Sequence, residues 1–153
     1  MRQSLVDNFR SFNAIVSCTS DLWEECNKIG YLCVMAYYVD DEWVLQKRIV
    51  GFHLYPYPHN ANAIFRTIME IFRFYGIEDE VLNITFDNVS SNMATINMFK
   101  RSLKPAFGGK NFHQRCACHI INFIVQARFE HISANLTNIR ESLSFISSSG
   151  PRL

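Results

Sequence analysis

The sequence predicts an α/β fold in which helices cover a mixed sheet. The first part of the chain opens with three strand-like segments joined by short turns. The later part alternates helix-like and strand-like segments. Because an antiparallel opening precedes alternating elements, we expect three antiparallel strands to share one sheet with the later strands.

Runs of apolar and β-branched residues define the opening strands. The first run covers residues 13–23 and becomes polar toward its end. The second run, YLCVMAYYVD, is interrupted by Asp40, Asp41 and Glu42 before WVLQKRIVGFHL follows. An acidic interruption between two β-rich runs predicts a hairpin of antiparallel strands.

Helical periodicity begins after the turn-rich segment YPYPHN. Apolar residues recur at helical spacing between Ile64 and Tyr75, and Gly76 is suited to end that helix. The segment VLNITF then predicts a short buried strand that ends at Asp87. Either Ser90 or Ser91 can cap the start of the next helix.

The last third of the sequence contains strong helix breakers. Pro105 and the glycine pair at 108–109 should end the second helix. The following segment, FHQRCACHIINFIVQARF, predicts a short strand and then one long apolar helix, and residues 147–151 are expected to form a loop.

Composition limits the class of protein. The 153 residues include 48% hydrophobic residues, which is enough for a core, and the formal charge of +1 gives no strongly basic face for nucleic acid. Five cysteines without a regular spacing favour reduced thiols in an intracellular protein. No apolar run reaches about 18 residues, so neither secretion nor membrane insertion is expected.

Two aspartates follow strand-like segments and are the candidate catalytic and metal-binding residues. Asp21 lies at the end of the first predicted strand, and Asp87 follows the fourth. If those strands are neighbours, the two carboxylates meet at one edge of the sheet and suit Mg²⁺ or Mn²⁺ in phosphodiester chemistry. The alternative is that both are turn residues, with Asp87 bonded to local backbone before a helix.

Five segments stand out in order along the chain: TSDLW at 19–23, GYLCVMAYYVDDEWVLQKRIVGF at 30–52, PHNANAIF at 58–65, TFDNVSSN at 85–92, and RCACHIINFIVQ at 115–126. Together they resemble hAT-family DNA transposases, and in particular the plant sleeper-type members with a BED zinc finger. The resemblance runs from about residue 14 to the end of the chain.

The resemblance implies an RNase H-like fold with two aspartates and a glutamate that bind two metal ions. Asp21 and Asp87 match the two aspartate motifs. We expect the third carboxylate to lie beyond Leu153 in the family, so that residues 14–153 form the first, truncated part of the domain after a lead at 1–13. The family's BED zinc finger is likewise expected to fall outside this sequence.

Four further residues are candidates for shaping the site. Asn88 and Asn92 flank the second aspartate, where amides can orient a carboxylate or contact a phosphate, although helix capping explains them equally well. Cys116 and His119 match a Cys-x-x-His motif of the family. No second ligand pair accompanies them, so we expect no zinc site and favour a packing or site-shaping role.

These observations lead to the hypothesis of a domesticated or truncated transposase-like protein without catalytic activity, nuclear by resemblance. DNA, bound weakly by the chain alone, and full-length transposase-like proteins are the expected partners, with no membrane and no small-molecule cofactor. The enzyme alternative is a metal-dependent nuclease that adds Glu130 or Glu141 to the two aspartates. Another alternative is a binding module that joins nuclear complexes through exposed apolar surface.

Overall fold

The computed structural model describes residues 5–7, 9, 15–24, 29–55, 60–87, 90–129 and 133–148. The chain divides into two compact units, residues 1–116 and residues 117–153, and each is described by itself.

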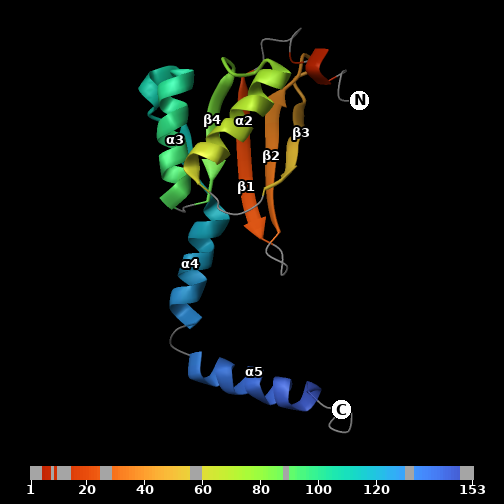
Figure 1. Ribbon diagram of the computed structural model, residues 1–153, viewed down its shortest axis with the longest axis vertical. Helices are drawn as coiled ribbons and strands as arrows, with labels where there is room; N and C mark the ends of the chain where they lie inside the picture. Colours follow the sequence, from red (N-terminus) through yellow and green to blue (C-terminus); the bar gives the residue numbers. More distant parts are fainter. Residues whose placement is uncertain are drawn as a thin grey trace. The chain divides into compact units, whose positions relative to one another are not determined.

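The first unit contains the sheet and the helices that cover it (Figure 1). Its elements, in chain order, are β1 (Val16–Glu24), β2 (Gly30–Val39), β3 (Leu45–Leu54), α2 (Ala61–Tyr75), β4 (Val81–Phe86), α3 (Ser90–Leu103), the 3-10 helix η1 (Ala106–Gly109) and β5 (His113–Arg115).

The sheet has five strands in the order β3-β2-β1-β4-β5. β1 pairs antiparallel with β2, and β2 pairs antiparallel with β3. β4 lies on the other side of β1 and runs parallel to it, and β5 runs parallel to β4. The predicted α/β class with a mixed sheet is therefore confirmed.

The predicted hairpin joins β2 to β3 through a turn organised by Asp40. Its Oδ1 accepts hydrogen bonds from the backbone N–H groups of Glu42, at 3.0 Å, and Val44, at 2.9 Å. These bonds, with a partner at Gln46 Nε2, keep the pKa of the Asp40 carboxyl below its ordinary value, and the Val44 bond is the largest cause. A side chain that bonds nearby backbone in this way stabilises a turn.

Helix α2 begins and ends as its sequence predicts. Asn60 caps its start, because the side-chain Oδ1 accepts a hydrogen bond of 2.8 Å from the Ala63 N–H. Gly76 follows the last turn with φ of 68°, a left-handed conformation that is strained for residues with a Cβ atom.

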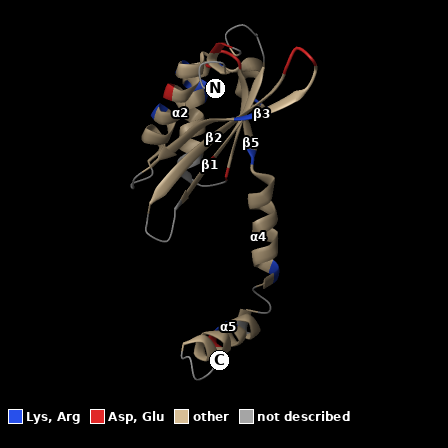
Figure 2. Cartoon of the chain, turned by 90° about the vertical axis from the view of Figure 1, so that its right-hand side faces the viewer, with Lys and Arg blue, Asp and Glu red and all other residues tan. Residues whose placement is uncertain are grey.

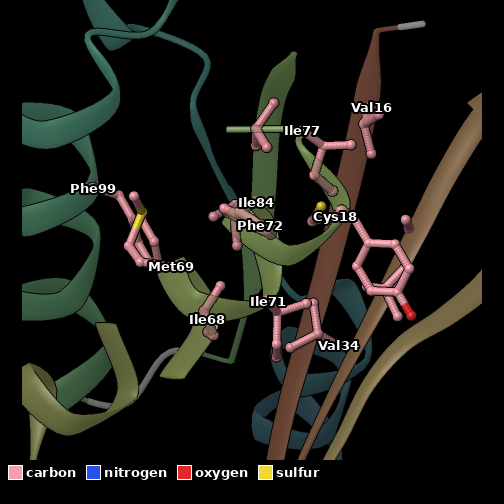
Figure 3. Close-up of a cluster of buried hydrophobic side chains, with 14 of the residues drawn as sticks. Val16, Cys18, Val34, Ile68, Met69, Ile71, Phe72, Ile77, Ile84 and Phe99 are labelled. Atoms are coloured by element: carbon pink, nitrogen blue, oxygen red, sulfur yellow. The ribbon is translucent and has the colours of Figure 1, made fainter. Parts of the chain in front are cut away.

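The core lies between the sheet and α2 and α3, as Figure 3 shows for side chains from all of these elements. Phe99 of α3 is fully buried, and its ring contacts the rings of Phe65, Phe72 and Phe112 at centroid distances of 4.9, 5.9 and 6.4 Å. The largest fully buried side chains are Phe72, Phe99, Phe112, Leu32, Ile64, Ile68, Ile77, Ile84, Ile96, Val16, Val34 and Thr95.

Residues near the N-terminus also contribute to this core. Val6 and Phe9 are buried, and the Phe9 ring makes edge contacts with Tyr38 at 4.9 Å and Tyr75 at 5.9 Å. The segment that precedes the first strand therefore packs against the ends of β2 and α2.

The second unit consists of α4 (Ala117–Phe129) and α5 (Ser133–Ser147). The sequence predicted one helix after the short strand, whereas the structure has two, and Ser147 ends α5 instead of opening a loop. No residue of α4 is buried, and Arg128 is its one charged residue apart from histidine (Figure 2). In the part of the chain that the structure describes, no helix is both long and apolar enough to cross a membrane.

Candidate functional site

Strand β1 alternates between core-facing and outward-facing side chains. Val16, Cys18 and Ser20 are buried, whereas Ser17 and Thr19 are half-buried and Asp21 is exposed. Successive side chains of a strand point to opposite faces of its sheet. Asp21 therefore lies on the face opposite the core helices, in line with Ser17 and Thr19.

The parallel pairing of β1 with β4 continues this polar line onto a second strand. Ser17 pairs with Asn83 and Thr19 with Thr85, and Asn83 Nδ2 donates a hydrogen bond of 3.2 Å to Ser17 Oγ. This bond joins two side chains on the same sheet face. We define the polar stripe as Ser17, Thr19 and Asp21 of β1, Asn83 and Thr85 of β4, and Asp87, the residue that follows β4.

The register of β1 with β4 relates the two candidate aspartates. The offset of 66 residues that pairs Ser17 with Asn83 and Thr19 with Thr85 also separates Asp21 from Asp87. The pairing ends at Thr19 and Thr85; continued by two residues, it would bring Asp21 and Asp87 next to each other on neighbouring chains about 4.8 Å apart. Asp87 is half-buried and is the first residue after β4.

Asp21 and Asp87 both lie toward the end of the sheet at which the parallel strands β1, β4 and β5 terminate. In open α/β sheets, ligands bind at the carboxyl ends of parallel strands. Asp21 and Asp87 thus occupy the part of the fold where chemistry is expected, and the polar stripe leads to them.

Cys33 is a neighbour of this site that the sequence did not single out. It pairs with Asp21 across the antiparallel ladder between β1 and β2. Partial burial raises the pKa of the Cys33 thiol, and the negative charge of Asp21 raises it further. The thiol is therefore neutral at physiological pH. Only the register between β1 and β2 could have identified it, because the two residues belong to separate strands.

Cys116 also lies beside the second aspartate. Its backbone N–H donates a hydrogen bond of 3.0 Å to the carbonyl oxygen of Phe86, the residue before Asp87. His119 belongs to α4 in the second unit, where its ring makes an edge contact with Phe123 at 4.5 Å. The site-shaping role predicted for Cys116 and His119 stays a prediction.

The other candidates are not placed at the site. Asn88 and Glu130 lie outside the described residues, and the Asn92 side chain does too, although its backbone belongs to the first turn of α3. Glu141 is exposed on α5, where it lines a shallow depression with neighbours from the same helix. The predicted roles of Asn88 and Asn92 remain predictions.

Metal binding was predicted for Asp21 and Asp87. Among them, no group of three or more His, Cys, Asp or Glu side chains is arranged to hold a metal ion. Asp21 and Asp87 give two carboxylates, and Mg²⁺ in proteins is commonly bound by one or two carboxylates together with water and phosphate oxygen. Asp21 and Asp87 thus have donor atoms of the kind that Mg²⁺ prefers, and their role as its ligands stays a prediction.

His113, on the neighbouring strand β5, has an imidazole whose pKa is shifted by its surroundings. Burial lowers the pKa of its imidazole, and the positive charges of Arg115 and Lys100 lower it further. Both neighbours are basic, so a proton on this ring is disfavoured by desolvation and by repulsion. This side chain is neutral at physiological pH.

Comparison with known proteins identifies relatives across nearly the whole chain. Putative AC transposase of Zea mays is 29% identical over 153 residues, which cover 97% of this chain and 19% of that protein. Zinc finger BED domain-containing protein RICESLEEPER 2 of Oryza sativa subsp. japonica is 28% identical, covering 99% of this chain and 22% of the relative. The chain spans about a fifth of the length of the curated relatives it matches.

A solved structure gives a weaker match. It is titled Structure of Mos1 transposase catalytic domain and Raltegravir with Mg, and it matches with 14% identity and a TM-score of 0.36 over 68% of this chain and 55% of that one.

The family model described as the ZBED1 RNase-like domain matches residues 19–112. That range starts two residues before Asp21, contains β2, β3, α2, β4 and α3, and includes Asp87. The matched residues thus contain the polar stripe from Thr19 onward and most of the core of the first unit. The chain belongs to the ZBED1 RNase-like domain family, among hAT and sleeper-type transposase-like proteins.

Proposed function

We propose that this chain is a transposase-derived RNase H-like module that binds one divalent cation at Asp21 and Asp87 and does not cleave DNA on its own. One observation carries the proposal. The pairing of Ser17 with Asn83 and of Thr19 with Thr85, whose offset of 66 residues is the same as that between Asp21 and Asp87, supports a shared site for the two carboxylates.

The count of carboxylates supports the non-catalytic part of the proposal. Two-metal phosphodiester chemistry holds its ions about 3.5–4 Å apart, so that one activates the attacking oxygen and the other stabilises the leaving one. Two aspartates are few ligands for two ions, and the described residues add no third carboxylate to the group. Catalysis would need a further acidic ligand from elsewhere.

The partners follow from the relatives. The similar proteins are named transposases and BED zinc-finger proteins, which supports DNA as the ligand of the assembled protein and the nucleus as its location. A formal charge of +1 gives the chain little general attraction for phosphate. We therefore expect weak DNA binding by the chain alone, and association with longer transposase-like proteins.

The test is a Mg²⁺ and Mn²⁺ titration that follows thermal unfolding beside cleavage of a labelled DNA duplex. A ligand that binds the folded state raises its stability by mass action. We expect both ions to raise the Tm of the wild-type chain, and Asp21→Asn and Asp87→Asn to abolish this increase. Asp41→Asn is the matched control, because Asp41 is exposed in the β2–β3 turn, away from the polar stripe.

Each readout can contradict the proposal separately. An equal Tm increase in all four proteins would show that the cation binds elsewhere. Metal-dependent cleavage that both site variants abolish would instead establish a nuclease, and Glu130→Gln and Glu141→Gln would then identify its third carboxylate.

A further inference from the structure

Strand β3 forms one edge of the sheet, on the far side from β4 and β5 (Figure 1). Among the described residues it pairs with β2 alone. Along its other side, backbone N–H and C=O groups therefore face outward, as in any edge strand. Such an edge is a template for an additional strand unless the protein protects it.

The first half of β3 is protected in two ways. Lys47 and Arg48 are consecutive charged residues in this half. The pairing with β2 then shifts, because Val34 pairs with Gly51 and Met35 with Ile49, which leaves Val50 as an extra residue. Charges and bulges are common means of preventing edge pairing.

The second half of β3 has no such protection. After the bulge, Gly51 to Leu54 pair regularly with β2. Phe52 is 55% exposed and Leu54 is 65% exposed, so apolar side chains flank an accessible backbone edge. Of the two halves, this one is suited to accept another strand.

A cavity opens beside this same half, on the face that α2 covers. Its volume is about 210 Å³. Small-molecule sites usually measure about 300–1,000 Å³, so this cavity suits a single side chain better than a whole ligand. The residues that line it are Val50 and His53 from β3, and Thr67, Glu70, Ile71, Phe74 and Tyr75 from α2.

We propose that the Gly51–Leu54 edge and this cavity bind an extended peptide of a partner protein. The peptide adds to β3 as a further strand and places one aliphatic side chain in the cavity. Strand addition supplies backbone hydrogen bonds for affinity, and a pocket for alternate side chains supplies specificity. The site goes beyond the proposed function, because β2 separates β3 from the strand that carries Asp21.

Charge favours a peptide whose flanking residues are acidic. Leu45 to Leu54 contains Lys47 and Arg48 and no acidic residue. A peptide that pairs with Gly51–Leu54 and continues past the bulge without pairing would place its end near these two cations. Complementary charges at the rim of an interface raise the association rate and fix the orientation of the partner.

The test measures binding of labelled octapeptides to the full chain. The probe is a set of pools that carry Glu at two consecutive terminal positions and alternate Thr with Val, Leu or Ile elsewhere. We expect at least one pool to raise the fluorescence anisotropy, and Thr67→Phe, which fills the cavity from α2, to weaken this binding at least tenfold. A peptide with Pro at its centre, which lacks a backbone donor, should lose binding similarly.

Charge exchange provides a control that does not depend on the cavity. The double variant Lys47→Glu and Arg48→Glu should lose the acidic peptides and bind versions with Lys in place of Glu. Arg101→Glu, an exposed substitution on α3, should leave the binding unchanged. Circular dichroism would establish that each variant keeps the wild-type fold.

Three results would overturn the proposal. The first is that no pool binds at millimolar peptide. The second is that the wild type and Thr67→Phe bind equally well, or that the proline peptide binds as tightly as its parent. The third is that sedimentation shows a dimer that Thr67→Phe dissociates, because a second copy of the chain would then occupy the edge.

Discussion

Gly51 allows helix α2 to approach β3 closely, and replacing it tests the packing between them. A Cβ atom at this position would lie 3.1 Å from Ile71 Cγ1 and closer still to Ile71 Cδ1. Ile71 is buried, so its side chain has little room to move away. We therefore predict that Gly51→Ala destabilises the first unit and that Ile71→Val, which removes Cδ1, partly rescues it.

The expected change in the free energy of unfolding for Gly51→Ala follows from two opposing contributions. Overpacking in a dense core costs about 1–3 kcal/mol, and Ala in place of Gly regains about 0.4–1 kcal/mol by restricting the unfolded chain. The net loss for Gly51→Ala is then about 1–2 kcal/mol. Ile71→Val alone costs about 0.5–1.5 kcal/mol. With the clash relieved, the double variant should be more stable than the sum predicts by about 1 kcal/mol.

The assay is urea unfolding followed by far-UV circular dichroism for the wild type, both single variants and the double variant. Gly108→Ala provides a control, because no atom lies within 4 Å of its added Cβ. Since Gly108 has a φ of 63°, any loss of stability in this variant comes from backbone strain. Its effect should be additive with Ile71→Val. If the losses of unfolding free energy from Gly51→Ala and Ile71→Val also add within about 0.5 kcal/mol, contact with Ile71 is not the reason that a Cβ atom at position 51 is destabilising.

Three further predictions concern pH, the core and a helix cap. The depressed pKa of His113 means that the unfolded chain binds a proton first as the pH falls below 6.5. Stability should therefore decrease as the pH falls from this value through the folded-state pKa, and His113→Asn should reduce that dependence of the Tm; an unchanged profile would refute the assignment. Phe99→Ala should cost about 3–5 kcal/mol in urea unfolding, whereas Phe107→Ala, at a side chain that is 79% exposed, should cost about 0.5 kcal/mol or less. Similar losses for the two would contradict the described core. Asn60→Ala should cost about 1 kcal/mol by removing the cap of α2, and Asn60→Asp should retain the stability because aspartate also caps; a loss in both would argue against capping.

The sequence alone predicted the elements whose signals are local. The acidic interruption at Asp40 to Glu42 identified the hairpin, since a polar turn between two β-rich runs brings its strands together. Helical spacing and Gly76 identified α2 and its end. In these segments the residues that decide the structure are near neighbours in the chain, so periodicity and turn chemistry are sufficient.

Pairing between distant segments depended on the tertiary structure. The sequence placed Asp21 and Asp87 after strands, but their meeting was conditional on β1 and β4 being neighbours, and no local pattern determines that pairing. The position of Cys33 opposite Asp21 depended in the same way on the register between β1 and β2. The second helix after β5 was missed because a weakly amphipathic polar segment has no clear period.

The extra residue in β3 and the cavity beside it were also decided by the fold. Val50 belongs to a run that predicts a strand, and although Gly51 within that run is compatible with a bulge, the run does not determine at which residue the pairing shifts. The cavity exists only where β3 and α2 lie next to each other, because residues of both elements line it. The sequence by itself thus determined the type of most elements and the two candidate aspartates. The tertiary structure decided which strands are neighbours, because long-range pairing depends on the packing of the whole core and not on adjacent residues.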